Sequence, residues 1–148
     1  MPNVRTYDPK QVILTVGGFP IGGYADGTFI QHEYDEDAFA KVTGADGFSS
    51  RAKSQNNDSM LTITLAQTSP SNNTLSALAL ADKLSNTGVV PVVMKDVGGT
   101  PGGETTLFSA NGWVRKQANL EYGKEITNRE WILDLTDTDL LVGGNVQS

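Results

Sequence analysis

The sequence predicts a mainly β protein, an antiparallel β-sandwich or open barrel of about six or seven strands with one flanking α-helix. The composition points this way, because the 148 residues include 16 Gly and are 38% hydrophobic, which favours short strands and many turns. Several short segments alternate apolar and polar residues, as half-buried strands do. Only one segment has a helical apolar period. The length fits a single domain spanning residues 1–148.

The first strands are expected near the N-terminus. Residues 11–16, Q-V-I-L-T-V, are rich in β-branched side chains. Gly17 and Gly18 follow them, and residues 19–24 add a short apolar piece. Residues 28–34 form the next expected strand, in which Gln31 and Glu33 point away from Ile30, His32 and Tyr34.

The later strands carry the clearest alternation. In residues 59–66, Leu61, Ile63 and Leu65 are expected to face a core, while Thr62 and Thr64 face outward. Residues 89–97 form an almost continuous apolar run, and residues 105–119 form a longer strand interrupted at Asn111 and Gly112. In the last strand, residues 126–135, the inward set is Trp131, Leu133 and Leu135, and the outward set is Glu130 and Asp134.

One helix is expected over residues 73–85. Pro70, Ser71 and Asn72 form a helix-start signal, because the Ser and Asn side chains can cap free N–H groups. The apolar stripe toward the sheet is predicted to be Ala77, Leu80, Ala81 and Leu84. Leu75 and Leu78 lie off this stripe, which leaves more apolar helix surface than one sheet covers.

Two segments have no regular pattern. Residues 35–58 are polar and contain G-A-D-G, so they are expected to form a long loop with a short helical turn over 36–42. Residues 137–148 are expected to form a flexible apolar tail, and residues 98–103 a flexible glycine-rich turn.

No motif indicates catalysis, so the sequence predicts a protein that is not an enzyme and needs no cofactor. The glycines of residues 17–23 lead into a strand, whereas dinucleotide and phosphate loops open a helix. His32 is the single histidine and is read as a half-buried strand residue, with a Ser-His-Asp triad as the less favoured alternative. The acidic cluster Glu33, Asp35, Glu36 and Asp37 lacks the spacing of a calcium loop and is read as a solvated face.

Charge and residue usage exclude further classes. The net charge is −6 with no run of Lys or Arg, which argues against stable binding to nucleic acid. No apolar run has the roughly 20 residues of a membrane helix, and the sequence start lacks a signal-peptide core. The absence of Cys suits a reducing cytosol.

The remaining features suggest a subunit completed by contact with its own copies. In order along the chain, D-P-K-Q-V-I-L-T-V-G-G-F-P-I-G-G-Y-A-D-G-T-F-I (8–30), Y-D-E-D-A-F and G-A-D-G-F-S-S-R (34–51), T-I-T-L-A-Q-T-S-P-S-N-N (62–73), N-G-W (111–113) and R-E-W-I-L (129–133) occur. This combination resembles the tail tube proteins of contractile-tailed bacteriophages, which are related to the tube protein of type VI secretion systems. The resemblance covers most of the chain.

The resemblance implies two packed β-sheets with a flanking helix. It also implies hexameric rings that stack into a tube for DNA, with neighbouring inner sheets joined into one β-lined channel. The long loop, here 35–58, would reach the next ring. The implied partners are further copies of the chain, the tail sheath, the baseplate hub and the tail terminator. The implied location is the virion tail, after assembly in the bacterial cytoplasm, with only transient passage of DNA.

Strand alternation and this resemblance together suggest two sets of functional residues. The channel-lining set is Gln31, Glu33, Thr62, Thr64, Glu130 and Asp134. Carboxylates, hydroxyls and amides there would let phosphates pass without the counterion release that makes DNA bind. The inter-subunit set is Asp35, Phe39, Phe48, Arg51, Leu75 and Leu78.

Two other function classes stay open at this point. One is a β-sandwich module that binds carbohydrate or a receptor, which an exposed aromatic platform would support. The other is an enzyme that uses the acidic cluster.

Overall fold

The computed structural model describes residues 8–97 and 104–143. The predicted turn at 98–103 and the part of the predicted tail at 144–148 lie outside the described residues. The described elements are the 3-10 helix η1 (Pro9–Gln11), the helix α1 (Ser71–Ser85), and the strands β1 (Val12–Val16), β2 (Phe19–Ile21), β3 (Ile30–Tyr34), β4 (Phe39–Thr43), β5 (Ser49–Lys53), β6 (Ser59–Ala66), β7 (Val90–Asp96), β8 (Thr105–Lys116), β9 (Asn128–Thr136) and β10 (Asp139–Leu141).

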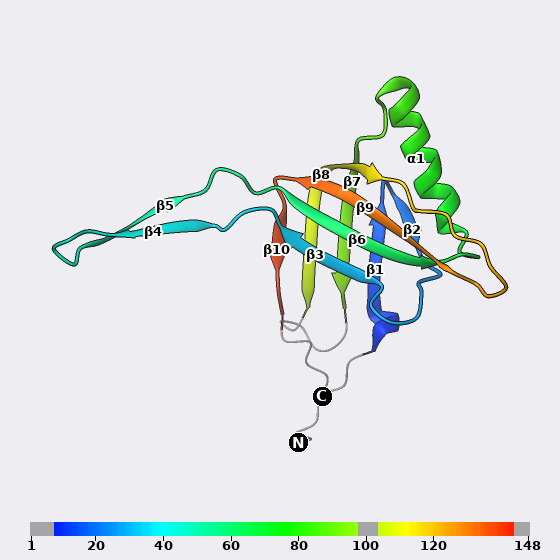
Figure 1. The fold of residues 1–148 in the computed structure, drawn as a ribbon, viewed down its shortest axis with the longest axis horizontal. Helices are drawn as coiled ribbons and strands as arrows, with labels where there is room; N and C mark the ends of the chain where they lie inside the picture. The colour runs from blue at the N-terminus through cyan, green and yellow to red at the C-terminus, as the bar shows by residue number, and fades with distance from the viewer. Residues whose placement is uncertain (1–7, 98–103, 144–148) are drawn as a thin grey trace, which may run out of the picture.

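Eight strands form one antiparallel sheet that is folded into two layers. The strand order is β2-β1-β7-β8-β9-β6-β3, and β10 pairs with β8. The first half of β8 pairs with β7 and β10, and its second half pairs with β9. Figure 1 shows β9, β6 and β3 crossing in front of β1 and β7. We call these the β6 layer (second half of β8, β9, β6, β3) and the β1 layer (β2, β1, β7, first half of β8, β10). The predicted mainly β fold is confirmed.

The sheet bends from one layer into the other at the interruption that the sequence predicts within residues 105–119. The pairing of β7 with β8 shifts between Val90, opposite Gly112, and Val92, opposite Ser109. A Cβ on Gly112 would lie 2.8 Å from Leu135 Cδ2 and 2.9 Å from a Val92 methyl group. A side chain at this position would therefore clash with residues of both layers, and glycine avoids the clash.

The core lies between the layers. Leu61, Ile63, Leu65, Leu133 and Leu135 of the β6 layer are buried, as the alternation of the sequence predicts. They pack in one cluster with Leu14, Val16, Val92 and Leu107 of the β1 layer. Each such aliphatic side chain contributes about 1.5–3 kcal/mol on burial, so this interface supplies most of the stabilisation.

The first glycine pair forms a tight turn, as predicted. Val16 pairs with Phe19, which leaves Gly17 and Gly18 as a two-residue loop. Their φ angles are +61° and +85°, values that glycine adopts without the clash a Cβ would cause. This geometry is that of a β-hairpin turn between β1 and β2 and not that of a loop opening a helix.

The helix α1 begins earlier than expected and buries a different face. Asn72 does not cap it, because its Oδ1 accepts a hydrogen bond from Trp131 Nε1 (2.9 Å). Leu75 is fully buried and Leu78 packs against the core, whereas Leu80 and Leu84 are 50% and 82% exposed. The predicted stripe is therefore wrong. The anchoring of the first turn to the sandwich decides which face is buried, and the last turns project away from it (Figure 1).

The segment 35–58 is a hairpin and not an irregular loop. β4 and β5 pair antiparallel around a turn in which Gly47 N–H donates to Gly44 O (3.0 Å) and Gly44 N–H to Phe48 O (2.8 Å). Gly47 has φ +82°, as the glycine of a type I turn with a bulge does. The expected helical turn over 36–42 is wrong. The hairpin projects far from the sandwich (Figure 1), and we call it the arm (residues 38–54).

The predicted tail is partly ordered. Asp139–Leu141 forms β10, which pairs with β8, and Thr138 is buried with its Oγ1 2.7 Å from Ser59 Oγ. The expectation of flexibility is therefore wrong for residues 137–143. The strand β10 has three residues, too few for an alternation of polar and apolar side chains to predict it from the sequence.

Candidate assembly surfaces

All six predicted channel-lining side chains lie on the solvent side of the β6 layer. Strand register places them in three rows across the strands. Glu33 lies opposite Met60, which lies opposite Asp134. Gln31 lies opposite Thr62, and Thr64 opposite Glu130. The structure thus brings the set together on one face, which we call the polar face; a role in lining a channel stays a prediction.

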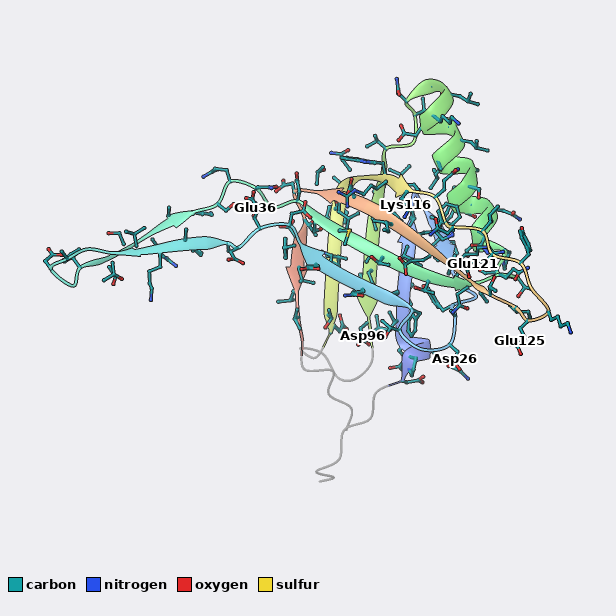
Figure 2. All side chains as sticks on the ribbon, in the orientation of Figure 1. Asp26, Glu36, Asp96, Lys116, Glu121 and Glu125 are labelled. Carbon is teal, nitrogen blue, oxygen red and sulfur yellow. The ribbon has the colours of Figure 1, made fainter. Side chains whose placement is uncertain are left out.

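The polar face is acidic, and one of its carboxylates lies beside a positively charged side chain. Figure 2 shows the side chains carried by the strands of the sheet. Arg115 on β8 lies 3.5 Å from a carboxylate oxygen of Asp134. Burial raises the pKa of the Asp134 carboxyl and the negative Asp35 and Asp58 raise it further, while Arg115 opposes them. Burial and the two neighbouring carboxylates therefore disfavour the charged form of Asp134 at this face.

The solvent side of the β1 layer has a different character. Ile13, Phe108 and Leu141 are 49%, 42% and 68% exposed. Their register places them on this side with Thr15, Val93, Lys95, Thr106 and Asp139. The two outer faces of the sandwich thus differ. The polar face carries several carboxylates and hydroxyls beside Met60 and Ile132, whereas the face of the β1 layer combines exposed apolar side chains with Lys95 and Asp139.

The predicted inter-subunit residues separate into two groups. Phe39, Phe48 and Arg51 lie on the arm and are exposed, and Asp35 is exposed at its root. Leu75 is 0% exposed, so it cannot reach a neighbouring chain, and Leu78 packs against the same core. The prediction is wrong for Leu75, because it faces the sandwich of its own chain; for the partly buried Leu78 an inter-subunit contact stays a prediction.

The candidate catalytic groups do not form a site. Burial lowers the pKa of His32, and its Nε2 is buried with no hydrogen-bond partner, so no nucleophile is in contact with it. Its ring lies edge-on to Tyr34 at 5.2 Å. Within residues 8–97 and 104–143, no three His, Cys, Asp or Glu side chains gather closely enough to hold a metal ion.

The exposed aromatic side chains do not form a binding platform. Phe19 lies on β2, Phe48 on the arm, Phe108 on β8 and Tyr122 on the segment before β9. A carbohydrate-binding surface would need them side by side, so nothing in this arrangement favours a binding module. No helix in the described part of the chain is long and apolar enough to cross a membrane.

Comparison with known families gives the strongest indication of identity. Residues 11–143 match the family described as the bacteriophage PhiTE tail tube protein. This match includes both layers, the arm and α1. The chain belongs to this phage tail tube family. It is also 27% identical over 148 residues to "Structural protein ORF10" of Pseudomonas phage KPP10, covering 95% of this chain and 83% of that protein.

Solved structures share the fold of this tail tube protein. The cap that terminates the tube of the anti-feeding prophage has a TM-score of 0.65 at 11% identity, covering 97% of this chain and 95% of that one. The sheath/tube terminator of the extracellular contractile injection system PVC has a TM-score of 0.65 at 12% identity, covering 95% and 100%. A chain of the PVC sheath-tube complex in the extended state has a TM-score of 0.62 at 13% identity, covering 93% of this chain and 92% of that one.

Sequence reasoning missed the arm and the exposed segment before β9. The arm had a signal, because Asp46-Gly47 is a hairpin dipeptide flanked by two five-residue segments that are now β4 and β5. The segment 117–127 has no regular pattern, and its exposure is set by contacts that only the fold reveals.

Proposed function

We propose that this tail tube protein assembles into six-membered rings that stack into a hollow tube, and that the polar face lines the bore through which DNA passes. The observation that carries this proposal is the contrast between the two outer faces. A wall along which a polyanion slides is best built from carboxylates, hydroxyls and amides, which release no counterions from DNA. The β6 layer presents these groups, whereas the β1 layer combines exposed apolar side chains with Lys95, a cation that would hold DNA phosphate.

Free strand edges support ring closure through the β6 layer. Among the described strands β3 pairs only with β6, and β8 beyond Gly112 pairs only with β9. Such edges invite pairing with another chain. An edge at each side of the same layer allows a head-to-tail contact that closes into a ring.

The strand number supports a bore of suitable size. The β6 layer contributes β8, β9, β6 and β3, so six copies give about 24 strands, and a spacing of about 4.8 Å gives a barrel about 37 Å across before strand tilt widens it. Side chains on the inner wall narrow this to a bore that still admits a DNA duplex. Stacked rings would be surrounded and closed by the sheath, the baseplate hub and the tail terminator.

Electron microscopy of the purified chain tests the proposal. We expect rings and tubes of constant width with a stain-filled bore. A chain that stays monomeric at high concentration under all assembly conditions contradicts it. The enzyme alternative has no support, because the acidic residues carry no arranged substrate or metal site in the described chain.

A further inference from the structure

An arginine on β9 is buried without a negatively charged partner. Arg129 is 5% exposed, and its guanidinium lies 5.2 Å from the ring centroid of Tyr122. Its Nη1 donates to Thr127 Oγ1 (2.7 Å) and Asn128 O (3.3 Å), and its Nη2 donates to Glu121 O (3.5 Å). All three acceptors are uncharged oxygens. In the described part of the chain, no carboxylate lies within ion-pair distance of this guanidinium.

The surroundings of this arginine are incomplete as an ion pair. A guanidinium carries five N–H donors in a rigid fork that matches the two oxygens of a carboxylate. The three bonds leave two of the five donors without an acceptor in the described chain. Buried charges in proteins are paired, because their removal from water is costly. Arg129 therefore calls for a carboxylate that the described part of a single chain does not supply.

The arginine lines a pocket with room for an acidic side chain. The pocket has a volume of about 380 Å³, and residues of α1, β9 and the segment after β8 line it. Trp131 and Tyr122 contribute aromatic walls, while Gln67 and Gln117 contribute amide groups. A carboxylate that entered here would interact strongly with Arg129, because the arginine is out of water and poorly screened. We call this site the Arg129 pocket.

The directions of the edge strands decide which part of a neighbouring copy would reach this pocket. In the β6 layer each strand pairs antiparallel with the next, so β3 and β8 at its two edges run in opposite directions. All copies in a ring have the same orientation. If β3 of one copy continues the sheet beside β8 of the next, the two strands are therefore antiparallel. Residues that precede Ile30 in one copy then lie next to residues that follow Lys116 in the other.

Asp26 is the acidic residue in the segment before β3. It is exposed and stands four positions before Ile30, a distance that extended chain spans in about 13 Å. Its neighbour Ala25 is buried and donates its N–H to Thr64 O (3.1 Å), which holds the backbone in place. Gly27 N–H donates to Asp26 Oδ1 (3.1 Å), which leaves Oδ2 for a second donor. Figure 2 labels Asp26 near the start of β3.

On the receiving copy, Arg129 lies beyond the end of β8. The last pair between β8 and β9 joins Lys116 to Ile132, so Arg129, three residues earlier on β9, has no residue of β8 opposite it. A neighbouring segment that continues along this edge meets Gln117 and the Arg129 pocket. We propose that Asp26 of each copy enters the Arg129 pocket of the next copy in the ring and pairs with the guanidinium. The inference rests on the proposed ring, and the site is complete only when the partner copy contributes its carboxylate.

Disulfide trapping tests the contact, because the chain contains no cysteine. Thr28→Cys/Gln117→Cys leaves Asp26 and Arg129 in place. Its tubes, oxidised and dissolved without reductant, should give a ladder of covalent multimers that ends at one complete ring. Thr28→Cys alone should give none, and neither should the matched control Thr28→Cys/Leu141→Cys, whose second cysteine lies on the outer face of the β1 layer. Tubes without a ladder, a ladder that runs past one ring, or an equal ladder from the control would overturn the assigned contact.

Removal of the charge tests the pair itself. Asp26 is exposed in the single chain, so Asp26→Asn should leave urea unfolding of the monomer unchanged. It should raise the concentration needed for tube formation at least tenfold, because Arg129 is then covered by the neighbour without a counter-charge. Asp26→Glu keeps the carboxylate and should lose less. Asp139→Asn, which removes an exposed carboxylate on β10, is the matched control and should assemble like the wild type.

The outcomes separate the two proposals. Asp26→Asn tubes that form at the wild-type concentration overturn the pairing with Arg129 and leave the ring intact. A control variant as defective as Asp26→Asn also overturns the pairing, because any lost carboxylate then has the same effect. A wild-type chain that forms no ring or tube overturns both proposals.

Discussion

The buried face of α1 yields the most specific test of the packing. Leu75 has no exposed surface, and Leu84 is 82% exposed. Leu75→Ala removes three buried carbons at about 0.8 kcal/mol each, about 2.4 kcal/mol in all, and the cavity raises the cost to about 3–4 kcal/mol. For a domain of this size each kcal/mol lowers the melting temperature by about 3 °C, so a decrease of about 10 °C is expected.

The assay is urea unfolding followed by circular dichroism, on dilute protein shown to be monomeric by gel filtration. Leu84→Ala is the matched control, and its free energy of unfolding should stay within about 0.5 kcal/mol of the wild type. If Leu84→Ala is as destabilising as Leu75→Ala, the helix buries the face that its sequence period predicts, and the reasoning from the anchored first turn is refuted.

Three further changes probe His32, the anchor of α1 and the polar face. Burial lowers the pKa of His32 below 6.5, so the stability that the neutral imidazole contributes is complete above pH 6.5 and is lost as the pH falls. Between about pH 7 and pH 5 the free energy of unfolding should therefore decrease more for the wild type than for His32→Leu. Equal decreases would contradict this expectation. Asn72→Ala leaves the buried Trp131 Nε1 without an acceptor and should cost about 1–3 kcal/mol in urea unfolding; a cost below about 0.5 kcal/mol would show that this bond does not anchor α1. Thr62→Lys/Glu130→Lys should leave tubes intact but slow DNA delivery from assembled phage, less so at high salt; unchanged delivery at low salt would argue against the polar face as the bore.

The strands and their faces were largely predictable because burial on one side of a sheet imposes a period of two. Leu61 and Ile63 alternate with Thr62 and Thr64 over a full strand, and the structure buries the leucine and isoleucine and not the threonines. The glycine turn was equally clear, since positive φ angles at Gly17 and Gly18 are what such a pair allows.

The parts that were not predictable depend on contacts between distant residues. The hydrogen bond between Asn72 and Trp131 joins residues 59 positions apart. It fixes the rotation of α1 about its own axis, so the predicted apolar stripe does not face the core. The arm has no buried side at all, so no period of two could reveal its strands, although the Asp46-Gly47 dipeptide marks its turn. Which surfaces contact other copies depends on chains that a single sequence does not describe.

The most direct test is a cryo-EM reconstruction of the purified tube at a resolution that shows side chains. We expect six copies per ring, with Gln31, Thr62 and Glu130 facing the bore. A bore lined instead by Ile13 and Phe108 of the β1 layer, or a filament with no bore, would contradict it.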